Sequence, residues 1–314
     1  MSRLRAAFFG TPEIAARHLP AVLDSEFQVD VVVTQPDRPR GRGLELSPPP
    51  AKVAALQHGL CVWQPEKLTP EFSRSLAELQ PDLIVVVACG HYLPKAVLEI
   101  PPLGCVNVHF SLLPALRGAA PVFWAIRRGC EATGVTTSYM VQELDAGDII
   151  LQREERIRPD DTTGSLQERL TDIGRDLLSE TLHLLAQGRA PRRPQDPSRA
   201  TRAPMVKKED GEIDWNVSPA DIERQVRACD PWPGAYTRWE GKLLKVTRAS
   251  EATDFAGAEG KPGTIAELGS HTGVCVVARG GAVRVLEVVP AGRRRMSAYG
   301  FACGAHLQVG FVLG

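Results

Sequence analysis

The sequence predicts an α/β protein: a mostly parallel sheet with helices on both faces, followed by a small antiparallel β-barrel. Over the first two thirds of the chain, short apolar runs alternate with helical patterns, which is typical of parallel sheets covered by helices. The last third instead has short β runs separated by turns that contain glycine, which favours a small barrel. A length of 314 residues fits two domains of roughly 150 residues each.

The elements of the first part follow from local patterns. Residues 83–88 are entirely apolar, as expected of a strand buried on both faces. Pro12 precedes apolar residues at helical spacing, which predicts a helix beginning there. On the same grounds we expect strands at 6–9, 29–34 and 105–108 and helices at 12–19, 51–58 and 165–185.

The pattern changes after the last of these helices. Residues 187–197 are rich in proline and arginine and have no periodicity, which predicts an extended linker. A helix capped by Ser218 and strands at 242–246, 273–278 and 282–288 follow. We therefore expect a first domain at 1–188, a basic linker at 189–205 and a second domain at 206–314.

Composition excludes several classes of protein. Lys plus Arg and Asp plus Glu both number 37, giving a net charge of zero, which argues against a histone-like polyanion binder. No run approaches the roughly 20 apolar residues of a membrane helix. The first residues lack the longer apolar stretch and the cleavage site of a signal peptide, so we expect none. Seven cysteines are scattered without a C-x-x-C pair, which indicates reduced thiols and no metal site. We expect a cytoplasmic, monomeric protein.

One strand end and one later loop carry candidate catalytic groups. Asn107 and His109 alternate, so on a strand they project from the same side and offer two donors to one oxygen. Asp145 and Asp148 lie in a loop that contains glycine. A core histidine and a turn-forming Asp-Gly pair would explain each feature separately. Together, the carboxamide, imidazole and carboxylate suit proton transfer during acyl transfer to an amine.

Several spaced motifs carry a resemblance to a known family. The run 109–114, the segment Arg117-Gly118-Ala119-Ala120-Pro121 and the run 144–152 resemble the folate-dependent formyltransferases. Residues 34–43 narrow the resemblance to the branch of that family that acts on methionyl-tRNA, and the segments 214–215, 222–228, 230–235 and 290–297 agree. The likeness extends from residues 9–12 to the end of the chain.

This resemblance implies a fold, a reaction and a set of site residues. It implies a Rossmann-like domain that binds 10-formyltetrahydrofolate and an OB-like barrel that helps to hold tRNA, with no metal. The catalytic residues would be Asn107, His109 and Asp145. The folate-binding residues would be Ser111, Leu112, Leu113 and Pro114. The residues that reach the acceptor end of the initiator tRNA would be Arg38, Arg40 and Arg42. Cys89 and Phe110 depart from the family pattern, and we expect them to alter the folate pocket and narrow its rim.

The expected reaction is transfer of the formyl group from 10-formyltetrahydrofolate to the α-amine of methionine on initiator tRNA, for translation initiation. One alternative is a formyltransferase for a small amine, either an amino sugar nucleotide or glycinamide ribonucleotide. The insertion at residues 34–43 and the second domain disfavour it. Another alternative is a non-catalytic RNA-binding protein, which the intact catalytic residues disfavour.

Overall fold

The structure, a computed structural model, describes residues 3–40, 45–255 and 260–314. The chain forms two compact units, each built from several segments. The first unit comprises Met1–Gly118, Ala132–Arg156 and Glu168–Ala203, and the second comprises Ala119–Glu131, Ile157–Gln167 and Pro204–Gly314.

The first unit is built on a seven-stranded sheet in the order β5-β2-β1-β6-β7-β8-β9. The strands are β1 Leu4–Gly10, β2 Phe27–Val33, β5 Val62–Trp63, β6 Leu83–Val87, β7 Cys105–His109, β8 Ala132–Tyr139 and β9 Ile149–Arg156. Strands β5, β2, β1, β6 and β7 are parallel, whereas β8 and β9 are antiparallel additions. The predicted mostly parallel sheet is confirmed, but the sequence patterns did not predict β8 and β9.

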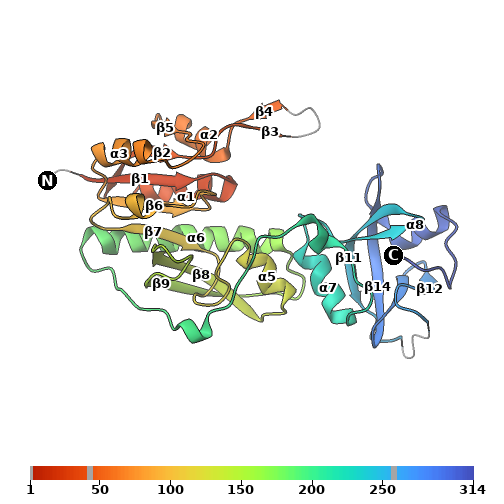
Figure 1. The fold of residues 1–314 in the computed structure, drawn as a ribbon. Helices are drawn as coiled ribbons and strands as arrows, with labels where there is room; N and C mark the ends of the chain where they lie inside the picture. Colours follow the sequence, from red (N-terminus) through yellow and green to blue (C-terminus); the bar gives the residue numbers. More distant parts are fainter. Residues whose placement is uncertain (1–2, 41–44, 256–259) are drawn as a thin grey trace. The chain divides into compact units, whose positions relative to one another are not determined.

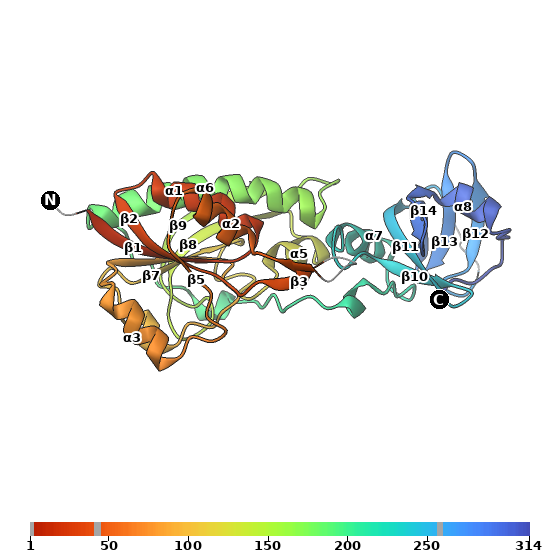
Figure 2. The same cartoon turned by 90° about the horizontal axis from the view of Figure 1, so that it is seen from above.

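Helices cover both faces of this sheet (Figures 1 and 2). One face carries α1 Glu13–Leu23, α2 Pro50–Gln57 and α6 Thr163–Ala186; the other carries α3 Pro70–Glu78 and α4 Lys95–Leu98. Phe9 and Val86 pack with Leu76 of α3 in one apolar cluster. Their neighbours along each strand point to the opposite face, because side chains alternate along a strand. The near-continuous apolar runs are therefore explained by burial on both sides.

The parallel strands β1, β6 and β7 end at the same edge of the sheet. Phe9 pairs with Val86, and Val86 pairs with Asn107. Ligands of open α/β sheets bind beyond this carboxyl edge. The end of β7 therefore places Asn107 and His109 at the expected position for a binding site.

A short hairpin, formed by β3 Arg38–Arg40 and β4 Glu45–Ser47, interrupts the α/β pattern. Its base is held by Asp37, whose carboxylate accepts hydrogen bonds from Lys52 Nζ at 2.8 and 2.9 Å and from Gln64 Nε2 at 2.7 Å. These bonds hold the pKa of Asp37 below its usual value. The sequence patterns did not predict this hairpin.

The second unit contains an antiparallel sheet, which confirms a C-terminal β domain. Its strands run in the order β10-β11-β14-β13-β12, with β15 paired to β14. They are β10 Tyr236–Trp239, β11 Lys242–Glu251, β12 Ile265–Gly269, β13 Gly273–Ala278, β14 Gly281–Pro290 and β15 Met296–Ser297. The unit also contains the helices α5 Pro121–Arg127 and α7 Pro219–Ala228, which precede these strands in the chain, and α8 Ala298–Gly304, which follows them. As predicted, Ser218 caps α7, and its hydroxyl accepts the N–H of Asp221. Among the described residues, no helix has the length and apolarity needed to cross a membrane.

Candidate active site

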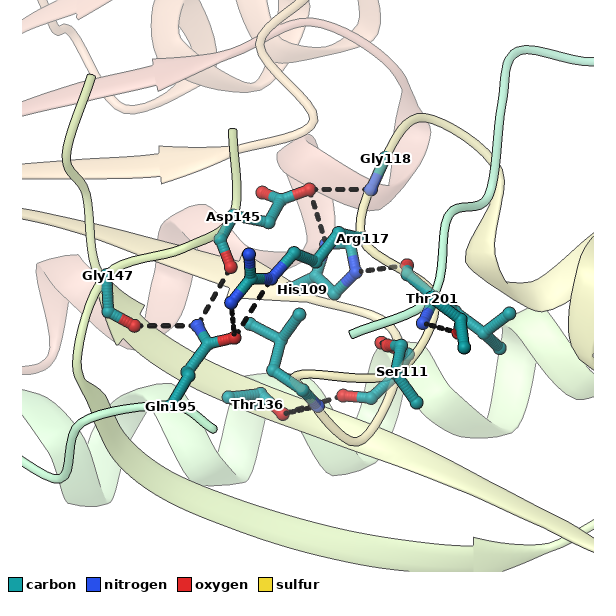
Figure 3. A network of polar contacts seen from close by, with 12 residues as sticks. His109, Ser111, Arg117, Gly118, Thr136, Asp145, Gly147, Gln195 and Thr201 are labelled. Carbon is teal, nitrogen blue, oxygen red and sulfur yellow. Dashed lines mark hydrogen bonds and ion pairs between the residues drawn. The ribbon is translucent and has the colours of Figure 1, made fainter. Parts of the chain in front are cut away.

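His109, at the end of β7, lies between two hydrogen-bond acceptors (Figure 3). Its Nε2 is 3.0 Å from the carbonyl oxygen of Leu116, and its Nδ1 is 3.7 Å from Oδ2 of Asp145. The side chain is buried. Since a carbonyl oxygen only accepts, Nε2 carries a hydrogen and donates it. This bond fixes the tautomer of the neutral ring and leaves Nδ1 facing the carboxylate.

Asp145 reaches this position from the loop between β8 and β9. Its φ is 52°, in the left-handed region that non-glycine residues rarely adopt, at a typical cost of about 1 kcal/mol or more. The backbone N–H of Gly118 donates a hydrogen bond of 2.7 Å to its Oδ2. The surrounding structure therefore holds the carboxylate beside His109 against a local conformational preference.

Two close backbone approaches shape the site. Gly118 has a φ of 127°, and a Cβ there would lie 2.4 Å from the carbonyl oxygen of Ala203. A Cβ at Gly147 would lie 1.8 Å from the carbonyl oxygen of Tyr139. Both positions therefore require glycine, because any side chain would displace a neighbouring segment of backbone.

Asn107 precedes His109 by two residues on the same strand. Its side chain is half-buried. Within the described part of the chain, its carboxamide makes no hydrogen bond to protein. A half-buried amide at the carboxyl edge of a sheet, with its donors free, is available to a ligand oxygen.

Asp148, the alternative candidate carboxylate, faces Arg192. Its Oδ2 lies 3.8 Å from Nη1 of Arg192, and the guanidinium of Arg192 also stacks over the ring of Tyr139 at 3.6 Å. Asp145, by contrast, is the carboxylate that lies beside His109. The structure thus separates two acidic residues that the sequence pattern left as alternatives.

The segment 111–114 forms a turn that begins two residues after His109, with Ser111 and Leu113 buried. The hydroxyl of Ser111 donates to the carbonyl of Ala115 at 2.6 Å, and the backbone of Leu113 bonds to Thr136 and Gln152. Leu112 and Pro114 are half-exposed. The hydrogen bonds of this turn thus stabilise its backbone conformation. Leu112 and Pro114 are the residues of the turn whose side chains a ligand can contact.

Comparison with known proteins identifies the family. A formyl transferase family model matches residues 4–182, and the model of the formyl transferase C-terminal domain matches residues 205–306. A methionyl-tRNA formyltransferase from Geotalea daltonii is 48% identical over 312 residues, covering 99% of this chain and 98% of the relative. This chain belongs to the methionyl-tRNA formyltransferase family. A second relative of that name, from Desulforamulus reducens, is 45% identical over 99% of this chain and 98% of its own.

The fold is shared more widely among formyltransferases. An N-formyltransferase from Helicobacter canadensis, solved with folinic acid and dTDP-3-aminofucose, superposes with a TM-score of 0.66. It is 18% identical, and the match covers 90% of this chain and 98% of that one. At this identity the likeness establishes only the fold.

Two unusual positions of this formyltransferase have local explanations. Phe110 is buried and packs edge-on against the ring of His18, with the ring centroids 5.9 Å apart; its effect on the rim of the site stays a prediction. Cys89 is buried after β6, with its Sγ 3.6 Å from Nδ1 of His91, and burial raises the pKa of its thiol to about 11.

The described residues include some of the basic residues that we expect to contact tRNA. Arg38 is exposed on the hairpin and lies 3.4 Å from Glu66. The backbone of Arg40 belongs to β3, and Arg42 lies outside the described residues. In the segment predicted as a basic linker, Arg193 donates to the carbonyl of Ile150 at 3.1 Å.

Sequence reasoning missed four residues of this site: Leu116, Gly118, Gln195 and Thr201. Gln195 donates to the carbonyls of Asp145 and Gly147, and the hydroxyl of Thr201 accepts the N–H of Leu116. Gly118 lies in one of the motifs that carry the family resemblance, but the motif did not indicate that its N–H binds Asp145. Gln195 and Thr201 lie in a segment without periodicity, so no local signal identified them.

Proposed function

We propose that this protein transfers the formyl group of 10-formyltetrahydrofolate to the α-amine of methionine esterified to initiator tRNA. The family membership supports formyl transfer, and the full-length relatives at 44–48% identity bear the name of this activity. The observation that carries the catalytic assignment is the position of His109 between Leu116 and Asp145, beside the unpartnered carboxamide of Asn107.

Asn107 acts on the formyl oxygen. As the amine adds to the formyl carbon, the oxygen gains negative charge, and a donor that is already positioned stabilises that charge. The carboxamide of Asn107 supplies an N–H without breaking an existing bond within the described protein. Its half-burial limits competition from water.

His109 and Asp145 handle the proton. The Nε2 of His109 is committed to the Leu116 carbonyl, whereas the 3.7 Å between Nδ1 and Asp145 exceeds hydrogen-bond length. Nδ1 is therefore the nitrogen that accepts the proton lost by the amine, and Asp145 stabilises the imidazolium. The proton passes to the nitrogen that leaves the formyl carbon, so charge and protons balance.

The folate supplies an activated one-carbon group, and the chain supplies binding and orientation. The residues present fit such a ligand. Among the described residues, the amide of Asn107 is free to donate to a ligand oxygen, and the adjacent turn offers the half-exposed apolar side chains of Leu112 and Pro114 for contact. We assign folate contact to the turn 111–114, in which Ser111 and Leu113 support the backbone.

The tRNA contacts rest on local charge within a neutral protein. Arg38 and Arg40 lie on the β3–β4 hairpin, and Arg42 follows Arg40 by two positions in the sequence. A basic loop can neutralise phosphates at the acceptor end, where unpaired bases are accessible. We assign catalysis to residues 1–188, connection to 189–205 and tRNA binding to 206–314, in a cytoplasmic monomer.

Formylation of charged initiator tRNA by the purified protein tests this proposal. With 10-formyltetrahydrofolate as donor, the product is N-formylmethionyl-tRNA. Mild hydrolysis of its ester releases N-formylmethionine, which chromatography separates from unreacted methionine. Transfer to an amino sugar nucleotide or glycinamide ribonucleotide, but not to the charged tRNA, would overturn the acceptor assignment. RNA binding without any transfer would overturn the enzymatic assignment.

A further inference from the structure

The segment 193–203, here called the strap, belongs to the first unit and is extended except for one 3-10 turn at Pro197–Arg199. Near its start, Arg193 and Ile149 exchange two backbone hydrogen bonds of 2.8 and 3.0 Å. Near its end, the N–H of Arg117 donates to the Thr201 carbonyl at 2.8 Å, and the N–H of Ala203 donates to the Arg117 carbonyl at 2.7 Å. The strap is therefore attached to the first unit on both sides of Gln195.

Gln195 uses its whole carboxamide to join the strap to the Asp145 loop. Its Nε2 donates to the carbonyls of Asp145 at 2.8 Å and Gly147 at 2.7 Å. Its Oε1 accepts two hydrogen bonds from the guanidinium of Arg117, at 2.8 and 3.1 Å (Figure 3). If the amide of Gln195 were flipped, its oxygen would face two carbonyl oxygens and its NH₂ would face the guanidinium of Arg117. Neither arrangement allows a hydrogen bond, so the network fixes the orientation of the amide.

Thr201 holds the opposite side of the site. Its hydroxyl accepts the N–H of Leu116 at 2.8 Å. Leu116 has a φ of 60°, a left-handed conformation that costs a branched residue about 1 kcal/mol or more. The carbonyl of this same residue accepts Nε2–H of His109. Thr201 therefore stabilises the strained turn that fixes the tautomer of His109.

Both hydrogen-bond or ion-pair partners of His109 thus belong to strained segments, and the strap holds each of them. Asp145 faces Nδ1 and is held through Gln195; Leu116 binds Nε2 and is held through Thr201. We propose that Gln195 and Thr201 are positioning residues that set the orientation and tautomer of His109. This inference rests on the proposed role of His109 and assigns a catalytic purpose to a segment whose sequence predicts only a linker.

Substitutions that keep the shape of the side chain but remove its hydrogen bonds test whether those bonds matter. Gln195→Glu keeps the length and the contact with Arg117 but replaces both N–H donors with an acceptor. Thr201→Val removes the hydroxyl and keeps the branching, whereas Thr201→Ser restores the hydroxyl. Ser198→Ala is the control, since Ser198 is an exposed strap residue whose hydroxyl, among the described residues, bonds only to Asp196.

In steady-state formylation of charged tRNA, we expect Gln195→Glu and Thr201→Val to lower kcat about 10- to 100-fold, because displacement of a reacting group by about 1 Å has effects of this size. KM for both substrates should change less than about three-fold, and Thr201→Ser and Ser198→Ala should retain kcat within about three-fold. A loss confined to KM, or equal losses in Thr201→Val and Thr201→Ser, would overturn the proposal.

A second measurement does not depend on activity. Two-bond ¹H–¹⁵N NMR spectra of the histidine rings report which nitrogen of His109 carries the hydrogen. The wild-type protein should show the Nε2–H form, and Gln195→Glu and Thr201→Val should shift or broaden these signals. Unchanged His109 signals in both variants would overturn the strap proposal. Absence of formyl transfer by the wild-type protein, with altered ring signals in the variants, would instead overturn the proposed function alone.

Discussion

The carboxylate of Asp145 lies 3.7 Å from Nδ1 of His109 and accepts the backbone N–H of Gly118 at 2.7 Å. This carboxylate is thus held by a fixed donor on one side and faces a titratable ring on the other. The two side chains come from segments that are far apart in the sequence.

Asp145→Asn should lower kcat by about 100-fold or more, because it removes the charge that stabilises the imidazolium of His109. The amide can still accept the N–H of Gly118, and asparagine tolerates a positive φ, so the fold should persist. Asp148→Asn is the matched control and should retain kcat within about three-fold, since it loses only a partly exposed contact with Arg192. Equal losses in the two variants would contradict the assignment of Asp145.

Asn107→Ala should lower kcat about 100- to 1000-fold, the usual effect of deleting one oxyanion donor. Asn107→Asp should lose a similar factor, because a carboxylate of the same shape cannot donate. Folate affinity, measured by equilibrium dialysis, should stay nearly unchanged in the alanine variant. Near-normal turnover of Asn107→Ala would rule out the oxyanion role.

Gly118→Ala should destabilise the protein by about 2–4 kcal/mol, because a new Cβ meets the Ala203 carbonyl at a positive φ. It should also lower kcat, since the N–H that holds Asp145 moves. Gly188→Ala provides the comparison: its φ is 65° and its Cβ would meet no atom within 4 Å, so about 1 kcal/mol is expected. Urea unfolding measures both, and similar costs for the two variants would refute the steric argument.

Arg38→Ala should weaken binding of charged initiator tRNA and reduce the slope of log K against log salt concentration by about 1, the value for one lost phosphate contact. The exposed pair with Glu66 contributes little to stability, so the fold should be unaffected. Arg74→Ala removes the same charge from α3 and should leave the slope unchanged. A slope that is flat in the wild-type protein would contradict an RNA partner.

His18 should make stability depend on pH. Its ring is fully buried; Nδ1 donates to the Ile14 carbonyl at 2.7 Å, and Nε2 has no partner among the described residues. Burial lowers the pKa of His18 to about 4, so the unfolded chain binds more protons between pH 6.5 and 4. The free energy of unfolding should therefore fall by up to about 3 kcal/mol as the pH drops through this window.

His18→Met removes this titration and keeps an apolar side chain in the core. Urea unfolding at several pH values should show a weaker dependence between pH 6.5 and 4 in the variant than in the wild-type protein. The difference between the two curves isolates His18 from the carboxylates, which titrate in both proteins. Curves with the same slope would contradict the assignment.

Local patterns predicted some elements of the sheet and missed others for a physical reason. β6 is an unbroken apolar run, so its burial was evident. β8 is also buried, but it contains Thr136, Thr137 and Ser138. The two threonine hydroxyls are tolerated because they have partners: Thr136 donates to the Ser111 carbonyl at 2.6 Å, and Thr137 bonds to Thr181 at 2.8 Å. Such partners are distant in the sequence, so no apolar pattern marked the strand.

The sequence by itself determined the parallel α/β core, the C-terminal antiparallel β domain and the alternation that places Asn107 and His109 on one side of β7. These features depend on residue periodicity, which is local. The family resemblance pointed to Asp145, but only the tertiary structure placed Asp145 beside His109 and Asp148 beside Arg192, and it alone brought Gln195 and Thr201 to the site. These choices depend on hydrogen bonds between distant segments, and on left-handed backbone at Asp145 and Leu116 that local preference disfavours. The local pattern of residues 193–203 is that of a linker, and only their hydrogen bonds to the first unit identify them as a strap.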